Sequence, residues 1–218
     1  MSLHHPFIDG EPTPGSAGEV GVHDPATGEE IGTVSRASSN DVDQAVNVAR
    51  ERHEEGIWRK ATVRHRRDVL RGIADLIRRD QERLAAMESE NAGKPIAAAR
   101  GEVGAVATTF DFYAGAVDKF HGQTIPGNAD GTLMTFREPI GVCAAITPWN
   151  FPMLILSWKA APALAMGNSI VVKPAEVTPL TALALAELAI EAGYLRGCST
   201  WSRGRDPRPG RPSSGIRS

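Results

Sequence analysis

The chain has 218 residues, of which 41% are hydrophobic and 23% are charged, and its formal net charge is −2. This composition is typical of a globular protein and excludes a fully disordered or fibrous chain. The near-neutral charge argues against a nucleic-acid partner for the chain as a whole. Two cysteines are too few for a disulfide-stapled secreted domain or a cysteine zinc site.

The charge is unevenly distributed along the chain. Residues 194–218 contain six arginines and one aspartate, so this tail has a net charge of +5 and residues 1–193 have −7. We expect the two segments to be separate units that meet at Gly193.

The sequence shows no targeting or membrane signal. Residues 1–6 lack the basic and apolar regions of a signal peptide. The most apolar stretch, 153–172, includes Lys159 and Asn168, which a membrane-spanning segment should not contain. We therefore expect a cytoplasmic protein with no membrane partner.

The N-terminal part predicts short strands and then helices. Residues 6–34 are rich in Gly, Pro and Thr, and Asp9-Gly10 predicts a hairpin turn. A helix should follow, because Ser39 and Asn40 are candidate N-caps and apolar residues then recur at helical spacing.

Two further amphipathic helices are expected. The first runs from about Thr62 to Asn91 with a break near Asp80, and the second opens at Pro95, a residue favoured in the first turn. Apolar stripes with charged outer faces are the normal pattern of core helices, so we expect no functional site on them. The stripe of the second helix consists of Val103, Val106, Phe110, Tyr113, Val117 and Phe120.

A hairpin at residues 123–138 precedes a predicted βαβ unit. Apolar runs without alternation at 141–146 and 169–172 predict two parallel strands buried on both faces. A helix at 153–166 should connect them, and Thr178 should cap a last helix.

Two loops follow these strands, at the edge where ligands bind in open α/β sheets. The loop at 147–152 contains Asn150, whose amide is a donor restrained by Trp149 and flanking prolines. Lys173 and Glu176 supply a cation and an acceptor suited to sugar hydroxyls or a phosphate. The alternative is that Asn150 is only a turn residue and Lys173 an exposed strand end.

Other site motifs do not fit. Gly93-Lys94 resembles the end of a phosphate-binding loop, but Glu88 stands where its first glycine should be, and no Gly-x-Gly-x-x-Gly follows either strand. The six histidines lack helical-pair spacing, so we expect no metal site. Cys143 lies within a predicted strand and is expected to be a buried small hydrophobe rather than a nucleophile.

Three motifs occur in a specific order: P-W-N-F-P at 148–152, G-N at 167–168 and K-P-A-E at 173–176. Upstream are F-I-D-G-E, D-P-A-T-G-E-E-I-G, A-G-K-P and R-E-P-I-G-V. In these features the chain resembles the NAD(P)-dependent aldehyde dehydrogenase superfamily, over about residues 6–193.

The resemblance implies an α/β fold: the N-terminal part of the aldehyde dehydrogenase fold, with helices and the start of a Rossmann-type parallel sheet. The hairpin at about 123–138 resembles the family's oligomerisation segment, which implies a homo-oligomer. The family oxidises small-molecule aldehydes to carboxylic acids with NAD or NADP through a cysteine thioester.

The resemblance also implies the site residues. Asn150 corresponds to the catalytic oxyanion donor. A carboxylate at the adenosine ribose favours NAD, with NADP as the alternative. The implied cofactor-lining residues are Ile146, Thr147, Pro148, Trp149, Asn150, Lys173, Pro174, Ala175 and Glu176.

The chain departs from the family after Gly193. The family continues L-P-x-G-V-x-N-V-V-x-G, and its catalytic glutamate and cysteine lie downstream, so we expect a truncated, inactive chain. Suitable GC-rich codons for residues 193–206, read one base out of frame, give L-P-A-G-V-L-N-V-V-P-G-P-G. We therefore expect residues 194–218 to be an out-of-frame, basic, disordered tail.

Two alternatives remain. One is a residual dinucleotide-binding module that uses the loops at 146–150 and 173–176 without catalysis. The other is a short protein whose basic tail contacts nucleic acid, which predicts salt-dependent DNA binding that is lost when residues 194–218 are deleted. We favour the enzyme fragment, without a nucleic-acid partner.

Overall fold

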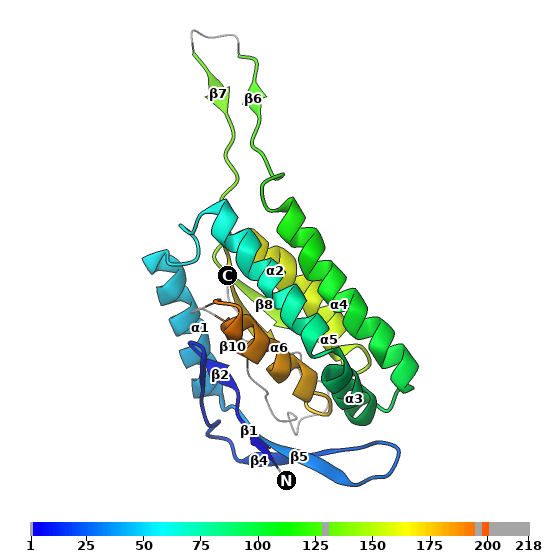
Figure 1. Ribbon diagram of the computed structural model, residues 1–218. Helices are drawn as coiled ribbons and strands as arrows, with labels where there is room; N and C mark the ends of the chain where they lie inside the picture. Colours follow the sequence, from blue (N-terminus) through cyan, green and yellow to red (C-terminus); the bar gives the residue numbers. More distant parts are fainter. Residues whose placement is uncertain (1, 128–130, 195–197, 201–218) are drawn as a thin grey trace.

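The computed structural model describes residues 2–127, 131–194 and 198–200 (Figure 1). The helices in these ranges are α1 (Ser39–Glu55), α2 (Val63–Arg79), α3 (Gln81–Ala92), α4 (Ile96–Ala116), α5 (Pro152–Ala165) and α6 (Leu180–Glu191). The strands in these ranges are β1 (Leu3–His4), β2 (Phe7–Ile8), β3 (Glu11–Pro12), β4 (Glu19–His23), β5 (Glu30–Ser35), β6 (Thr124–Ile125), β7 (Leu133–Met134), β8 (Val142–Ile146), β9 (Ser169–Lys173) and β10 (Cys198–Thr200).

The central sheet has the strand order β3-β2-β10-β9-β8. β8 pairs parallel with β9 up to the pair Ile146↔Lys173, and β9 pairs parallel with β10. At the other side of β10, β2 runs antiparallel and forms a hairpin with β3. β8, α5 and β9 thus form the expected βαβ unit, and the predicted α/β fold is confirmed.

Helices pack on both faces of this sheet (Figure 1). On one face Val171 of β9 packs with Ala45 and Ala49 of α1. On the other face Ile170 and Val172 belong to the main core, beneath α5 and α6. Successive side chains of a strand point to opposite faces, so one strand contributes to two cores. α2, α3 and α4 pack on α5 and α6 as an outer layer.

The N-terminal turn and sheet follow local sequence signals. Asp9 and Gly10 have φ values of 56° and 82° between β2 and β3. Two consecutive positive φ values are the geometry of a type I′ hairpin turn, so the predicted turn is confirmed. A separate three-stranded sheet has the order β1-β5-β4.

The start of α1 differs by one residue from the prediction. The N-cap is Ser38, not Ser39 or Asn40. The Ser38 hydroxyl accepts from the Asp41 amide, and the Asp41 carboxylate accepts from the Ser38 amide. This reciprocal capping box satisfies two amides that the helix itself leaves unpaired, which explains the earlier start.

The predicted break at Asp80 is confirmed, because Asp80 ends α2 and precedes α3. The second predicted helix, α4, follows Pro95, and Val103 and Phe110 of its stripe are buried. Phe120 is exposed, contrary to the expected stripe, because α4 ends at Ala116 and the chain then leaves the helical layer.

The hairpin expected at residues 123–138 is present and projects away from the helices (Figure 1). Ile125 of β6 pairs with Leu133 of β7. Several of its apolar side chains are exposed: Leu133 and Met134 are about half exposed, and Phe136 is 78% exposed. The hairpin therefore presents an apolar surface.

The prediction that the first parallel strand is buried on both faces is wrong. β8 is the edge strand of the sheet, and Ala144 and Ile146 on it are exposed. Only Ala145 is buried at this end of the strand, on the face covered by α5. β9 lies between β8 and β10 and is buried over residues 169–172, as expected.

Two features near the C-terminus also differ from the predictions. Thr178 does not cap α6, because its hydroxyl donates to the main-chain carbonyl of Trp149 at 3.1 Å, and Pro179 takes the N-cap position. Residues 198–200, expected in a disordered tail, form β10. Main-chain pairing with β9 explains this, because it does not depend on side-chain identity. The rest of the expected tail lies outside the described residues, apart from Tyr194, which is buried.

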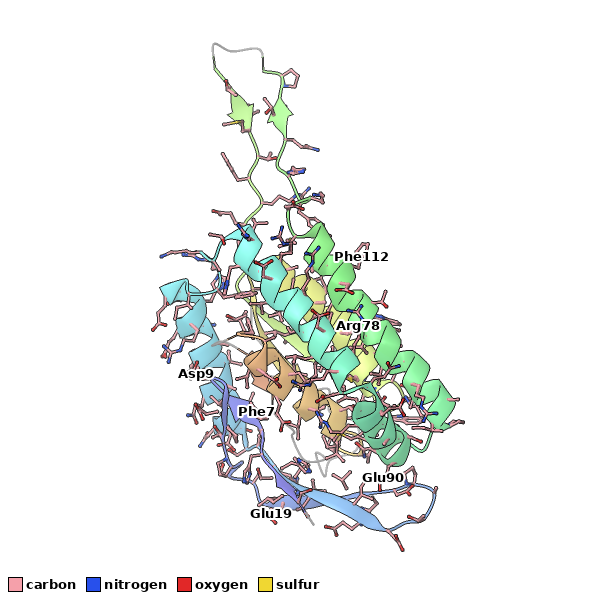
Figure 2. All side chains as sticks on the ribbon, viewed as in Figure 1. Phe7, Asp9, Glu19, Arg78, Glu90 and Phe112 are labelled. Carbon is pink, nitrogen blue, oxygen red and sulfur yellow. The ribbon has the colours of Figure 1, made fainter. Side chains whose placement is uncertain are left out.

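The outer helices are joined by ion pairs. Arg78 of α2, labelled in Figure 2, pairs with Asp111 of α4. Arg79 pairs with Glu191 of α6 in the same way. Among the helices of the described chain, none is long and apolar enough to cross a membrane.

Candidate functional site

The two loops of interest begin side by side at the carboxyl edge of the parallel strands. Ile146, the last residue of β8, is in register with Lys173, the last residue of β9. The amide of Thr147 then donates to the carbonyl of Lys173 at 3.0 Å. Strand pairing thus places the loops at 147–151 and 174–179 next to each other, as the sequence analysis expected.

Asn150 lies in the first loop with its side chain exposed. Within the described residues its side-chain amide has no hydrogen-bond partner, so both of its N–H groups are available to a ligand. Its main chain is held, because the carbonyl of Asn150 accepts from the Lys94 ammonium at 3.0 Å. The carbonyl of the preceding residue, Trp149, accepts from Thr178. An unpaired side-chain amide on a fixed backbone is suited to act as a preorganised hydrogen-bond donor.

Lys173 and Glu176 form an ion pair at the exit of β9, with 2.7 Å between Nζ and Oε1. The ammonium also donates to the carbonyl of Pro174 at 3.4 Å. Both side chains are half-buried. One donor and one acceptor held close together match the pattern of vicinal hydroxyls on a sugar.

The other predicted cofactor-lining residues differ in exposure. Ile146 is 59% exposed and Trp149 is also exposed, so both can contact a ligand with their side chains. Pro148 and Ala175 are half-buried, and Pro174 is buried, so it can contribute only main-chain atoms.

Thr147 is buried, and its hydroxyl has no hydrogen-bond partner within the described chain. A buried hydroxyl without a partner costs free energy unless something satisfies it. This orphaned group lies at the start of the first loop, among the residues expected to line the cofactor.

Sequence reasoning missed Lys94, which follows α3. Its ammonium donates to Glu88 at 2.9 Å, to Glu102 at 2.6 Å and to the carbonyl of Asn150. It also lies 5.0 Å from the centre of the Phe151 ring. In the sequence, Gly93-Lys94 stands out only as an imperfect phosphate-loop ending and as part of the A-G-K-P motif, neither of which predicts the contact of this lysine with the Asn150 loop.

Glu88 is also buried, between Lys94 and the first turn of α6. Its second carboxylate oxygen accepts from the Thr181 hydroxyl of α6 at 2.7 Å. Burial raises the pKa of Glu88, although its hydrogen bonds to Thr181 and Lys94 act in the opposite direction. A low dielectric disfavours the charged form, while donors to the carboxylate favour it.

Asn91 completes the contact between α3 and the second loop. Its amide nitrogen donates to the carbonyl of Val177 at 2.9 Å, and its oxygen accepts from the amide of Leu180 at 3.3 Å. Glu88 and Asn91 are spaced i, i+3 on the buried face that includes Leu84. Polar residues on an apolar helical face are a signal that could have identified them.

Cys143 is half-buried in the edge strand β8, not fully buried as predicted. Burial raises the pKa of its thiol, which favours the unreactive protonated form. In the part of the chain that the structure describes, no group of His, Cys, Asp and Glu side chains is arranged to hold a metal ion.

The model of the aldehyde dehydrogenase family matches residues 13–204 of the chain. The chain belongs to the aldehyde dehydrogenase family. The match covers both loops and extends beyond Gly193, where the sequence analysis placed the boundary.

Known members of the family support this assignment. Human retinal dehydrogenase 2 is 45% identical over 207 residues, which cover 94% of this chain and 40% of the relative. A double mutant of betaine aldehyde dehydrogenase from Staphylococcus aureus, solved in complex with NAD+, is 35% identical with a TM-score of 0.90, over 92% of this chain and 41% of that one. An NADP-dependent enzyme of E. coli is 37% identical with a TM-score of 0.90, and the match covers 94% of this chain and 43% of that one.

The chain thus spans about 40% of the length of the curated relatives it matches. Its structural neighbours include both an NAD+ complex and an NADP-dependent enzyme.

Proposed function

We propose that this chain supplies the oxyanion donor and the ribose-binding loop of an aldehyde dehydrogenase that oxidises a small-molecule aldehyde with NAD. The observation that supports this most is the position of Asn150, whose free amide lies in the loop after β8, while the Lys173–Glu176 pair lies at the exit of the neighbouring strand β9. In this proposal both features face one bound dinucleotide and substrate.

Asn150 is the catalytic residue in this proposal. When a thiolate attacks an aldehyde, negative charge develops on the former carbonyl oxygen. An amide N–H aimed at that oxygen stabilises the charge in the transition state more than in the ground state, and such a donor typically contributes about 10²–10³ in rate.

The residues of the second loop fit the adenosine ribose of a dinucleotide. The Lys173 ammonium can donate to a ribose oxygen, while the Glu176 carboxylate accepts from a ribose hydroxyl. A carboxylate at this position repels a 2′-phosphate, so NAD is preferred to NADP. The orphaned Thr147 hydroxyl supports a polar ligand nearby. When bound, the nicotinamide ring accepts the hydride from the substrate carbon.

Residues 1–218 alone are not expected to complete the reaction. By motif, neither the family's nucleophilic cysteine nor its general-base glutamate has a counterpart in them, and an oxyanion donor without a nucleophile cannot form the thioester. The proposed role is therefore one part of the active site. The alternative proposal, favoured only if dinucleotide binding is tight, is a binding module without catalysis.

Purified residues 1–218 test these possibilities. We expect no aldehyde-dependent NADH formation and weak NAD binding, at about the millimolar level. Measurable turnover would contradict the proposed division of the active site. Micromolar NAD affinity in a calorimetric titration without turnover would favour the binding module.

We also propose that the hairpin β6–β7 contacts a second copy of the chain, because its apolar side chains are exposed. Light scattering of a variant that lacks residues 123–136 would test this, with a monomer as the expected result. A cytoplasmic location stays a prediction that cell fractionation would test.

A further inference from the structure

The Lys94 ammonium has three N–H donors, and each has an acceptor on a different segment. Glu88 belongs to α3, Glu102 to α4, and the carbonyl of Asn150 to the first loop. A fully used ammonium has a defined position, since each donor fixes one direction. Lys94 is therefore placed by two helices before it reaches the loop.

These groups are shielded from water. The side chains of Glu88, Lys94 and Glu102 are 1%, 12% and 15% exposed. Hydrogen bonds between charged groups are stronger in such an environment than at the surface, and an unpaired charge there is costly. The bond to Asn150 therefore anchors the loop more firmly than a bond from an exposed lysine would.

The same end of α3 also holds the second loop. Glu88 accepts from Thr181, and Asn91 bonds Val177 and the amide of Leu180. Glu88 therefore bonds both Lys94, which holds the carbonyl of Asn150, and Thr181, which lies at the start of α6. These bonds connect the restraint on the Asn150 backbone to the start of α6. One turn of helix thus links the two loops of the candidate site.

The backbone at Gly93 brings Lys94 to this point. Gly93 ends α3 with a φ of 68°, a left-handed conformation that favours glycine. An added Cβ would also lie 2.5 Å from Cγ of Pro25, which packs on this corner. Both features require glycine immediately before the lysine.

We propose that Lys94 is a positioning residue, which fixes the main chain of Asn150 and couples the 147–151 loop to the start of α6 through Glu88. This inference rests on the proposed oxyanion role of Asn150 for its functional meaning. Its physical content, the restraint of the loop, can be measured without cofactor or substrate.

Two amides report on the loop. The Thr147 amide donates to Lys173, and the Ile155 amide donates to Phe151. In residues 1–218 without ligand, Lys94→Met should speed hydrogen exchange at these two amides by about tenfold, because the loop loses a charge-assisted hydrogen bond. Amides of the β4–β5 ladder should exchange at the unchanged rate.

A spectroscopic signature gives an independent reading. In protein labelled with 5-fluorotryptophan, the Trp149 fluorine resonance, assigned with Trp149→Phe, should shift or broaden in Lys94→Met. The resonance of Trp58, buried in the main core, should stay in place. Lys119→Met is the matched control, since Lys119 is an exposed lysine paired only with its neighbour Asp118 in the described chain.

Two further variants keep the test decisive. Glu88→Gln retains hydrogen-bonding groups toward Lys94 and Thr181, so its loop exchange should stay within about threefold of the wild type. If Lys94→Met exchanges faster everywhere, Lys94→Met/Glu88→Gln removes the more deeply buried of the two carboxylate charges that the lysine no longer pairs, and Glu102 at 15% exposure keeps the other. Fast exchange confined to the loop in that double variant supports the proposal.

The proposal would be overturned if a folded Lys94 variant, single or double, kept the wild-type hydrogen-exchange rates at the two loop amides and the wild-type Trp149 resonance. Absence of NAD binding by the wild-type chain would count against the proposed function but not against this restraint.

Discussion

The buried carboxylate of Glu88 accepts a 2.7 Å hydrogen bond from the hydroxyl of Thr181, 93 residues further along the chain. Thr181→Val keeps the side-chain shape but leaves one carboxylate oxygen without its donor. We expect the free energy of unfolding in urea to fall by about 1–3 kcal/mol. Thr108→Val is the control, because that exposed hydroxyl bonds only within its own helix, and it should change stability by less than about 0.5 kcal/mol. Equal losses in the two variants would contradict the buried bond.

The contribution of Asp80 to stability should depend on pH. Hydrogen bonds from Arg79 and then Arg83 lower the pKa of Asp80 to about 2 from 3.8. A carboxyl group whose pKa is lower in the folded state stabilises the fold at pH values above its pKa in the unfolded chain. That stabilisation is lost as the pH falls toward the pKa in the folded state. Asp80→Asn should therefore be less stable than the wild type by about 0.5–1 kcal/mol at pH 7.

This difference should shrink steadily as the pH falls below 3.8. Urea unfolding at several pH values measures it. A pH-independent difference for Asp80→Asn would be inconsistent with the pKa shift.

The coding DNA beyond the Gly193 codon should contain a one-base frameshift. Read in the shifted frame, residues 193–206 should become a family-like L-P-x-G-V-x-N-V-V segment. Resequencing the gene and translating it in all frames checks this. A shifted frame without that segment would show that residues 194–218 are native sequence.

The catalytic role of Asn150 can be measured in the protein read on through that shifted frame. Asn150→Ala should lower kcat by about 10²–10³, because the transition state loses its oxyanion donor. The KM for NAD should change little. Asn47→Ala, on the exposed side of α1, is the matched control. An unchanged kcat would exclude Asn150 as the donor.

Short-range signals in the sequence predicted much of the fold. The Asp9-Gly10 turn and the break at Asp80 depend on neighbouring residues, and both are confirmed. The P-W-N-F-P and K-P-A-E motifs placed both loops at the correct edge of the sheet, since parallel strands end at the same edge. Family membership followed from the same motifs.

Long-range contacts could not be predicted in this way. The predicted N-cap of α6 is wrong because Thr178 bonds the carbonyl of Trp149, 29 residues away, rather than its own helix. Lys94 reaches Asn150 across 56 residues, and no local pattern encodes that contact. The edge position of β8 follows from the order of strands in the sheet, which an apolar run such as 141–146 does not specify.

The loops after β8 and β9 should form part of a dinucleotide site. NAD titration of ¹⁵N-labelled residues 1–218, followed by NMR, can locate that site. We expect weak binding with shifts confined to amides near 146–150 and 173–176, and their loss in Glu176→Ala but not in Glu187→Ala, a change on the exposed side of α6. Shifts located elsewhere, or none in a folded protein at millimolar NAD, would show that these two loops do not bind the dinucleotide.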